Sequence, residues 1–162
     1  MLQQINSWIR DRADGFFGSP FGATFIRTTI RPLDHLFYRL SGRRFLFLNA
    51  FIPTLMLTSI GAKSGQSRTV PLLYLRDGVR IVLIASNYGR GSHPAWYYNL
   101  QANPSCTLTI AGREQAYLAR EADGVERDQL WQRALELYGG YEAYQRRAAD
   151  RRIPVMILES VR

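Results

Sequence analysis

The chain is poor in cysteine and histidine, and this scarcity excludes several kinds of site. A single cysteine, Cys106, rules out an intramolecular disulfide framework and is typical of a reducing compartment. It stands at the start of an expected strand, where a small buried side chain is a better interpretation than a catalytic thiol. The two histidines, His35 and His93, lie far apart and show no zinc-like spacing with one cysteine, so we expect no metal.

A long apolar run is also missing. The most apolar stretch, residues 45–57, is interrupted by Asn49 and Pro53 and is too short to cross a bilayer. Residues 1–12 contain charge but no apolar core of a secretory signal. We therefore expect a cytoplasmic protein in which this stretch forms a buried strand, with a turn at Pro53.

Acidic residues are the minority charge. The chain has 13 Asp and Glu against 21 Lys and Arg, which gives a net charge of +8. This excess favours an anionic partner, such as nucleic acid, an acidic lipid surface or a polyanionic cofactor. The arginines are spread along the chain without the basic tract that marks a nucleic-acid tail, so we expect no nucleic-acid partner. A length of 162 residues with 46% hydrophobic residues fits one globular domain.

Lysine is almost absent, because Lys63 is the only one beside 20 arginines. It lies between Gly61 and Gly65, which let the backbone take unusual conformations and approach a ligand closely. Ser64 adds a hydroxyl, and Arg68 adds a planar fork suited to phosphate or carboxylate. The pattern predicts a loop that receives an anion. The alternative is an ordinary solvated hairpin loop.

Hydrophobic spacing divides the chain into two parts. Residues 1–42 are expected to be helical, because Leu2, Ile5, Trp8 and Ile9 recur at spacings of three and four. Such a basic amphipathic segment either packs on its own domain or lies on an anionic membrane surface. Residues 43–162 form the second part. Strands are expected at residues 55–58, 69–75, 79–85, 106–110, 114–119 and 153–158, and helices at residues 94–102, 123–137 and 141–149. Hairpin turns are expected at Asp77-Gly78 and at residues 111–113. The helix that begins at Asp123 is expected to be capped and to bury an inner stripe of Leu130, Trp131, Ala134 and Tyr138. These elements predict an α+β domain built on a small barrel.

A second polar loop, residues 86–94, leaves one strand and opens a helix. The unpaired N–H groups and positive dipole end of a helix N-terminus favour an anion. The glycine spacing of the two loops matches neither a phosphate-binding P-loop nor a dinucleotide-binding motif. Together they predict one phosphate-bearing ligand held from two sides.

The motifs resemble those of the deazaflavin-dependent nitroreductase family. Residues 61–72 match its G-x-K-[ST]-G-x-x-R-x-x-P-L signature, and the later blocks match in order and spacing. These later blocks are Ala85-Ser86-Asn87, His93-Pro94-Ala95-Trp96-Tyr97-Tyr98-Asn99-Leu100, Ala102-Asn103-Pro104, Tyr138-x-x-Tyr141-x-x-Tyr144 and Arg152-Ile153-Pro154-Val155. The resemblance covers about residues 36–160. The chain departs from it at Asn87 and Tyr88, where many members have a basic residue and a glycine.

The resemblance implies a split β-barrel of the flavin-reductase or FMN-binding type. It also implies coenzyme F-420, a deazaflavin with a phosphodiester and an acidic glutamyl tail, and hydride transfer to a quinone-like or nitroaromatic acceptor. Matched position by position, the expected coenzyme contacts are Ala62, Lys63, Ser64, Arg68, Thr69, Val70, Pro71, Leu72, Leu73, Ile84, Ala85, Ser86, Asn87, Ala95, Trp96, Tyr97, Tyr98 and Asn99. Among these, Trp96 suits core packing equally well, and Tyr97 and Tyr98 are not both expected to face inward.

The spacing of Tyr138, Tyr141 and Tyr144 places them on one helix side if the segment is continuous. The resemblance makes them candidates for the wall of the acceptor pocket, with a phenol as hydrogen-bond or proton donor. A packed aromatic stripe is the alternative. Two further interpretations stay open from the residues: the same barrel with FMN, and a non-catalytic carrier of the coenzyme or of an apolar ligand.

Overall fold

The computed structural model describes residues 53–161 and Thr28. The expected N-terminal helical segment, residues 1–42, and the domain boundary at residue 43 lie outside this described part. The strands are β1 (Thr54–Ile60), β2 (Ser67–Asp77), β3 (Arg80–Ile84), β4 (Ser105–Ile110), β5 (Arg113–Glu121) and β6 (Val155–Ser160). The helices are the 3₁₀ turn η3 (Asn87–Gly89), α4 (Ala95–Ala102), α5 (Gly124–Leu137) and α6 (Gly140–Arg147).

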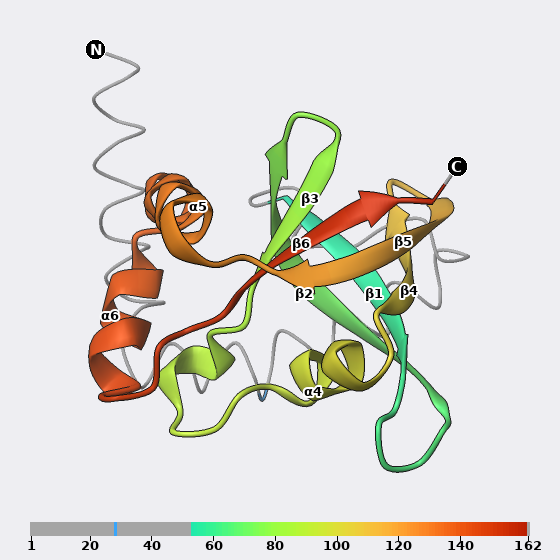
Figure 1. The fold of residues 1–162 in the computed structure, drawn as a ribbon, viewed down its shortest axis with the longest axis horizontal. Helices are drawn as coiled ribbons and strands as arrows, with labels where there is room; N and C mark the ends of the chain where they lie inside the picture. Colours follow the sequence, from blue (N-terminus) through green and yellow to red (C-terminus); the bar gives the residue numbers. More distant parts are fainter. Residues whose placement is uncertain (1–27, 29–52, 162) are drawn as a thin grey trace.

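The six described strands form one closed antiparallel barrel in the order β1-β2-β3-β6-β5-β4 (Figure 1). Two-residue turns build two of its hairpins, because Asp77 pairs with Arg80 and Ile110 pairs with Arg113. Ala111 and Gly112 both have positive φ angles (49° and 77°), as the turn that suits strand twist requires. The expected strands and hairpins are confirmed, although the first turn uses Gly78 and Val79, one position later than predicted.

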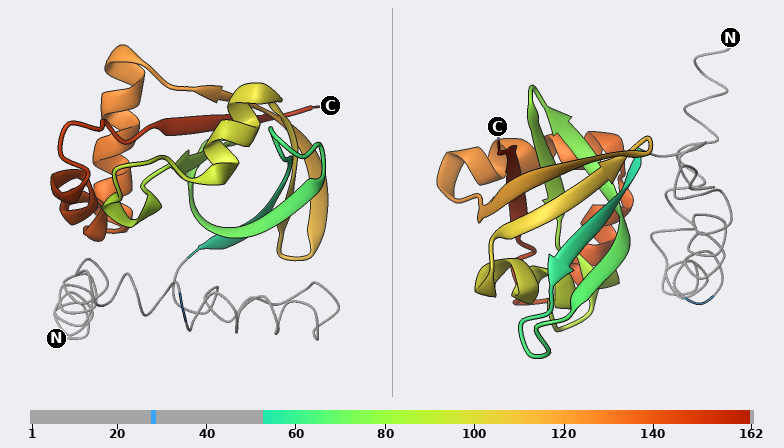
Figure 2. Two further views of the ribbon diagram at one scale, coloured as in Figure 1. Left: turned by 90° about the horizontal axis from the view of Figure 1, so that it is seen from below. Right: turned by 90° about the vertical axis from the view of Figure 1, so that its right-hand side faces the viewer.

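The barrel interior is the first of two apolar clusters. It contains Leu55 and Leu57 of β1, Leu83 of β3 and Leu158 of β6, all at most 1% exposed. Helix α4 lies across one end of the barrel and adds Trp96 and Leu100 to this cluster (Figure 2). Successive residues of a strand point to opposite faces, so the interior takes every second residue of each strand.

The second apolar cluster lies outside the barrel, under α5 and α6. The outward residues of β3 and β6 pack there against Leu130, Trp131 and Ala134 of α5. These helix residues recur at spacings of one, three and four, which gives α5 one apolar face. The predicted inner stripe of this helix is therefore confirmed. Because both faces of β3 and β6 are covered, their sequences are nearly continuous apolar runs.

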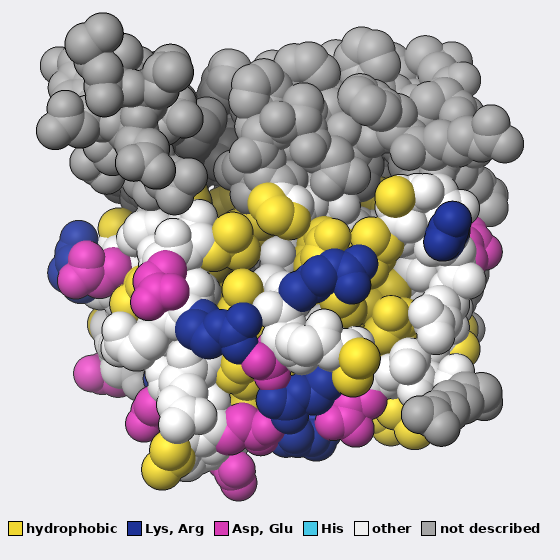
Figure 3. Space-filling view, turned by 90° about the horizontal axis from the view of Figure 1, so that it is seen from above, with side chains coloured by type: hydrophobic (Ala, Val, Ile, Leu, Met, Phe, Trp, Pro, Cys, Tyr) yellow, Lys and Arg dark blue, Asp and Glu magenta, His cyan; other side chains and the backbone are white. Residues whose placement is uncertain are grey.

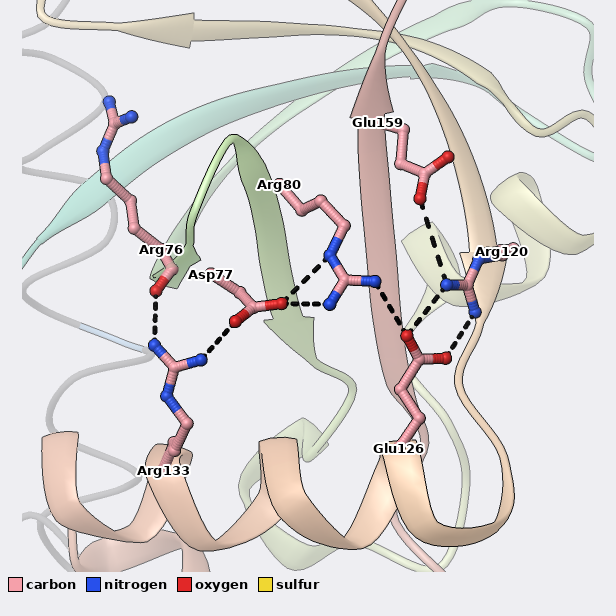
Figure 4. A network of polar contacts seen from close by, with 7 residues as sticks. All are labelled: Arg76, Asp77, Arg80, Arg120, Glu126, Arg133 and Glu159. Carbon is pink, nitrogen blue, oxygen red and sulfur yellow. Dashed lines mark hydrogen bonds and ion pairs between the residues drawn. The ribbon is translucent and has the colours of Figure 1, made fainter.

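Charged side chains tie the β2–β3 hairpin to α5 and β5. The carboxylate of Asp77 accepts hydrogen bonds from Arg80 and Arg133, and Glu126 accepts hydrogen bonds from Arg80 (2.8 Å) and Arg120 (2.8 and 3.0 Å) (Figure 4). The hydrogen bond from Arg120, followed by that from Arg80, lowers the pKa of Glu126 to about 2. Figure 3 shows acidic and basic side chains adjacent to one another on the surface of the molecule seen from above. This network thus joins the β2–β3 hairpin, α5 and β5 through paired acidic and basic side chains.

Two local expectations differ from the structure. Asp123 stands at the N-cap position of α5, but its side chain makes no capping hydrogen bond. Pro94 precedes the first residue of α4 instead of occupying it. The two expected helices at residues 123–137 and 141–149 are separate, since Tyr138 has extended backbone angles (φ −151°, ψ 101°) and α6 begins at Gly140.

The single cysteine is buried in the barrel, as predicted. Burial raises the pKa of the Cys106 thiol to about 12, so it stays protonated at neutral pH. Among the described residues no helix is both long and apolar enough to span a membrane.

Candidate functional site

The first part of the candidate site is the loop between β1 and β2, residues 61–66, which we name the lysine loop. Two backbone hydrogen bonds close it: Gly61 N–H donates to the Gln66 carbonyl, and Gly65 N–H donates to the Gly61 carbonyl, each at 2.8 Å. Gly65 has a φ of +66°, a conformation that glycine adopts readily. The loop is thus a fixed turn with its side chains pointing outward.

Lys63 of this loop and Arg68, just after it on β2, have no acidic partner in the described part of the chain. Lys63 and Arg68 are both exposed, and no described carboxylate lies within ion-pair distance of either. Arg68 donates a hydrogen bond to the Gln66 side-chain oxygen (3.1 Å), and the Ser64 hydroxyl accepts one from the Gln66 N–H (3.3 Å). Uncompensated positive charge on an ordered loop suits an anionic ligand.

Asn99 of α4 holds the lysine loop in place through its side-chain amide. Its side-chain oxygen accepts a hydrogen bond from the Ala62 N–H (3.0 Å), and its side-chain N–H₂ donates to the Ser59 hydroxyl (3.2 Å). The side chain is only 8% exposed. Asn99 was expected among the coenzyme contacts, and the structure shows that its amide is engaged by the protein on both sides.

The β2 residues that were expected to contact the coenzyme point to different faces of the barrel wall. Thr69 is exposed, while Val70 and Leu72 are half-buried against the interior cluster. Leu73 packs instead against the cluster under α5 and α6. This alternation follows from the pleat of the strand, so adjacent β2 residues cannot all face one ligand.

The segment after β3 contains three consecutive residues with positive φ. Ile84 and Ala85 are buried, and Asn87, Tyr88 and Gly89 then have φ angles of 47°, 58° and 75°. We name Asn87–Gly89 the left-handed turn. A left-handed conformation is natural for glycine and tolerable for asparagine, but it costs a bulky residue energy. This explains why glycine suits the position of Tyr88 in the resembled motif.

Helix α4 presents its five expected site residues in different directions. Ala95 and Tyr98 are exposed, and Trp96 is buried in the barrel, which confirms core packing for Trp96 and a surface place for one of the two tyrosines. The Tyr97 hydroxyl donates a hydrogen bond to Glu121 (2.8 Å). Burial and this carboxylate raise the pKa of Tyr97 to about 12.

Tyr138, Tyr141 and Tyr144 meet as one group, which we name the tyrosine cluster. Their ring centroids lie 5.2–6.2 Å apart, and the Tyr138 and Tyr144 hydroxyls share a hydrogen bond of 3.0 Å. The condition for one helix side, a continuous segment, is not met, because the three residues come from the end of α5 and from α6. A glycine at 140 permits this contact, since a Cβ there would lie 2.3 Å from the Tyr138 ring.

Tyr141 has the most unusual environment of the three. It is 5% exposed, and its hydroxyl makes no hydrogen bond with any residue of the chain that the structure describes. Burial raises the pKa of the Tyr141 hydroxyl, and it is also the largest cause of the raised pKa of Tyr144. A buried hydroxyl without a partner is costly, and it is a feature of positions that meet a ligand.

A row of contacts joins these parts along one end of the barrel. The lysine loop meets α4 through Asn99, and the His93 ring lies 4.6 Å from that of Tyr97 at the start of α4. The left-handed turn meets α6 through Tyr88, whose ring centroid lies 6.0 Å from that of Tyr144. Figure 1 shows the lysine loop, α4, η3 and α6 following one another at the lower edge of the molecule. Sequence blocks 61–68, 84–87, 95–99 and 138–144 are thus brought together.

One residue of this region was missed by the sequence analysis. Arg151 lies between α6 and β6, and its guanidinium contacts the segment after β3 and His93. Among 20 arginines nothing in the local sequence distinguished it. Its position next to the Arg152-Ile153-Pro154-Val155 block was the only available signal.

This chain is similar to a group of reductases. The family model described as F420H(2)-dependent quinone reductase matches residues 30–160. A putative F420H(2)-dependent quinone reductase of Mycobacterium tuberculosis is 36% identical over 107 residues, which are 66% of this chain and 89% of that protein. An F420H(2)-dependent quinone reductase of the same organism is 37% identical over 109 residues, 65% of this chain and 72% of the relative. A solved F420-H2 dependent reductase matches with a TM-score of 0.61 and 39% identity, over 66% of this chain and 94% of that chain.

Proposed function

Because this chain belongs to the F420H(2)-dependent quinone reductase family, we propose that it transfers a hydride from reduced coenzyme F-420 to a quinone-like acceptor. The family decides the cofactor in favour of F-420 over FMN and makes the chain an oxidoreductase. Within the structure, the row of contacts from the lysine loop to the tyrosine cluster carries the proposal. It supplies a cationic end and a buried aromatic end to one extended site.

The residues of the lysine loop fit the anionic part of this coenzyme. A phosphodiester and glutamyl carboxylates require exposed cationic donors, and Lys63 and Arg68 have no acidic partner among the described residues. Ser64 adds a hydroxyl beside them. We assign these three side chains to the phosphate and the tail, with Asn99 and the backbone of the segment after β3 shaping the rest of the binding surface.

The aromatic end of the site suits the acceptor. The bound coenzyme supplies a hydride from its ring carbon. A quinone also needs one proton to become a hydroquinone, because hydride transfer alone leaves an anion on its oxygen. Tyr141 is the donor that we assign to this step: its buried hydroxyl carries its proton at neutral pH, as a phenol ordinarily does, and no described residue competes for it. Solvent returns the proton to Tyr141 after release.

Lys63→Ala tests the anion site. We expect the dissociation constant for F-420, measured by fluorescence titration, to rise about tenfold, because a charge-assisted contact to phosphate or carboxylate is lost. Arg113→Ala is the matched control, since Arg113 is an exposed cation at the end of the barrel opposite the lysine loop. Equal losses in the two variants would show that net charge alone attracts the coenzyme. A parallel titration with FMN checks cofactor choice.

Tyr141→Phe separates an enzyme from a non-catalytic carrier. We expect turnover with menadione to fall by about ten- to a hundredfold, the usual contribution of a positioned proton donor. The melting temperature should hold or rise, because the substitution removes a buried hydroxyl without a hydrogen bond in the described structure. Tyr117→Phe, in the barrel interior, is the control for losing a buried phenol elsewhere. Wild-type turnover of Tyr141→Phe would remove Tyr141 from the mechanism and favour the carrier.

Other parts of the assignment remain predictions. We propose that the closed barrel is a split barrel of the flavin-reductase type and that nitroaromatic compounds are a second acceptor class. Cytoplasmic location and contact of residues 1–42 with an anionic membrane surface are supported by composition alone. Salt-sensitive sedimentation with anionic liposomes, lost on deletion of residues 1–30, would establish the membrane contact.

A further inference from the structure

The backbone of the left-handed turn is strained, so contacts with its surroundings must stabilise it. Three consecutive residues with positive φ are rare, and Asn87 and Tyr88 are not glycines. Internal hydrogen bonds contribute: Gly89 N–H donates to the Ser86 carbonyl (3.0 Å), and the Asn87 side chain donates to the Ser92 carbonyl (2.9 Å). Strained segments of this kind persist only where their surroundings over-determine them.

Arg151 donates hydrogen bonds to backbone carbonyls at both ends of this turn, an arrangement that we name the grip. Its Nη2 donates to the Ser86 carbonyl (2.8 Å) before the turn, and its Nε donates to the Arg90 carbonyl (2.9 Å) after it. Nη1 lies 3.4 Å from the Ala85 carbonyl oxygen and 2.9 Å from His93 Nδ1. A planar guanidinium presents its donors in a fixed fork, so these acceptors are held at fixed positions relative to one another.

The contact between Arg151 and His93 fixes the state of the histidine. A guanidinium only donates, so Nδ1 of His93 must accept, and the ring must be neutral with its proton on Nε2. The groups that face His93 are Arg151, Glu121 of β5, and Tyr97 and Tyr98 of α4. Protonation of Nδ1 would remove the acceptor and place two cations against each other.

We propose that Arg151 is a positioning residue that holds the left-handed turn in the shape that receives the coenzyme, and that protonation of His93 breaks this hold. The inference rests on the proposed function, because it assigns the Ser86 and Asn87 segment to coenzyme binding. Beyond the proposed function, the inference assigns a positioning role to Arg151 and makes coenzyme binding depend on the protonation of His93.

The direction of the pH response follows from the charges. Burial, followed by repulsion from Arg151, lowers the pKa of His93 below its usual 6.5, and the charge of Glu121 opposes this. The grip is therefore complete above pH 6.5 and is lost as the pH falls through the pKa of His93 in the folded protein. Stability should fall as the pH drops from 6.5 to the pKa of His93 in the folded protein, and coenzyme affinity should fall as the pH drops through that lower pKa.

The test compares the neighbouring arginines. Arg151→Met removes the grip, and Arg152→Met is the matched control, because Arg152 is exposed and, among the described residues, pairs only with Asp128. At pH 7.5 we expect the dissociation constant for F-420 to rise at least about tenfold in Arg151→Met and to stay at the wild-type value in Arg152→Met. Equal affinities in the two variants would overturn the proposal.

His93→Gln isolates the pH response, because glutamine can still accept from Arg151 but does not titrate in this range. We expect wild-type affinity for F-420 to weaken from pH 7 to pH 5 and that of His93→Gln to stay flat. Identical pH profiles would overturn the role of His93. If Arg151→Met does not fold, Arg151→Lys keeps the charge without the planar fork and should lose affinity in the same way.

A second readout needs no coenzyme. The imidazole NMR signal of His93, assigned by its loss in His93→Gln, should titrate below 6.5 in the wild type and closer to 6.5 in Arg151→Met. Arg152→Met should leave it in place. If even the wild type binds no F-420, the proposed function fails, and this titration still shows whether Arg151 and His93 are coupled. If the His93 titration is the same in Arg151→Met as in the wild type, the two residues are not coupled.

Discussion

Replacing Gly89 with alanine is expected to destabilise the protein strongly. A Cβ at this position would lie 2.6 Å from the Tyr144 carbonyl oxygen and 2.9 Å from the Arg147 Cβ. The backbone of η3 and that of α6 would have to separate, because no rotation of a side chain relieves a clash with a carbonyl. With a φ of +75° adding conformational strain, we expect a loss of roughly 3–5 kcal/mol in the free energy of unfolding.

Gly78→Ala is the matched control for this substitution. Gly78 also has a positive φ (61°), but nothing lies within 4 Å of the added Cβ. The free energy of unfolding of Gly78→Ala should therefore fall only by the cost of the backbone conformation, about 1 kcal/mol. Chemical denaturation of both variants gives the difference directly. A Gly89→Ala variant as stable as Gly78→Ala would show that the turn and α6 do not pack as closely as the structure has them.

The same variant should also disturb the tyrosine cluster. Tyr144 belongs to α6 and touches both the left-handed turn, through Tyr88, and the hydroxyl of Tyr138. Displacing α6 would separate these groups, so near-ultraviolet circular dichroism of the tyrosines should weaken in Gly89→Ala and persist in Gly78→Ala. Loss of stability without this spectral change would place the damage elsewhere.

The second large effect is expected for Asn99→Leu. The substitution leaves the Ala62 N–H and the Ser59 hydroxyl without their partner in a position that is 8% exposed. Leaving buried polar groups unpaired should cost roughly 2–4 kcal/mol of folding free energy. Because the Ala62 bond holds the lysine loop on α4, F-420 affinity should fall as well. Thermal unfolding and fluorescence titration measure the two effects.

Ser59→Ala distinguishes the two hydrogen bonds of Asn99. It removes the bond to β1 but keeps the bond from Asn99 to the Ala62 N–H. We expect a modest loss of stability, about 1 kcal/mol, with coenzyme affinity close to that of the wild type. If Ser59→Ala weakens F-420 binding as much as Asn99→Leu does, the lysine loop is not held through Ala62 and the positioning role of Asn99 is wrong.

Features that depend on near neighbours were predictable. The two-residue turns at Gly78 and at Ala111-Gly112 follow from residues that accept positive φ, and the inner stripe of α5 follows from helical spacing. The burial of Cys106 follows from its strand setting. Local signals also misled: Asp123 has the chemistry of a helix cap, yet its side chain makes no such bond.

Features that depend on closure of the barrel were not predictable. Strand β6 inserts between β3 and β5, and β1 pairs with β4, so residues far apart in the chain become neighbours. This is how Arg151 reaches the Ser86 carbonyl across 65 positions and how the Asn99 amide reaches the Ala62 N–H across 37.

The sequence by itself determined the family, the cofactor class and the identity of the cationic loop, because these depend on ordered motifs and on one lysine among arginines. It also determined the hairpins and the apolar helix face, since turn chemistry and periodicity are local. Only the tertiary structure decided which candidate residues have exposed side chains and which, like Asn99 and Arg151, hydrogen-bond to the backbone of neighbouring segments. The physical reason is that hydrogen-bond partners and burial are set by the closed barrel, whose pairings join distant parts of the chain.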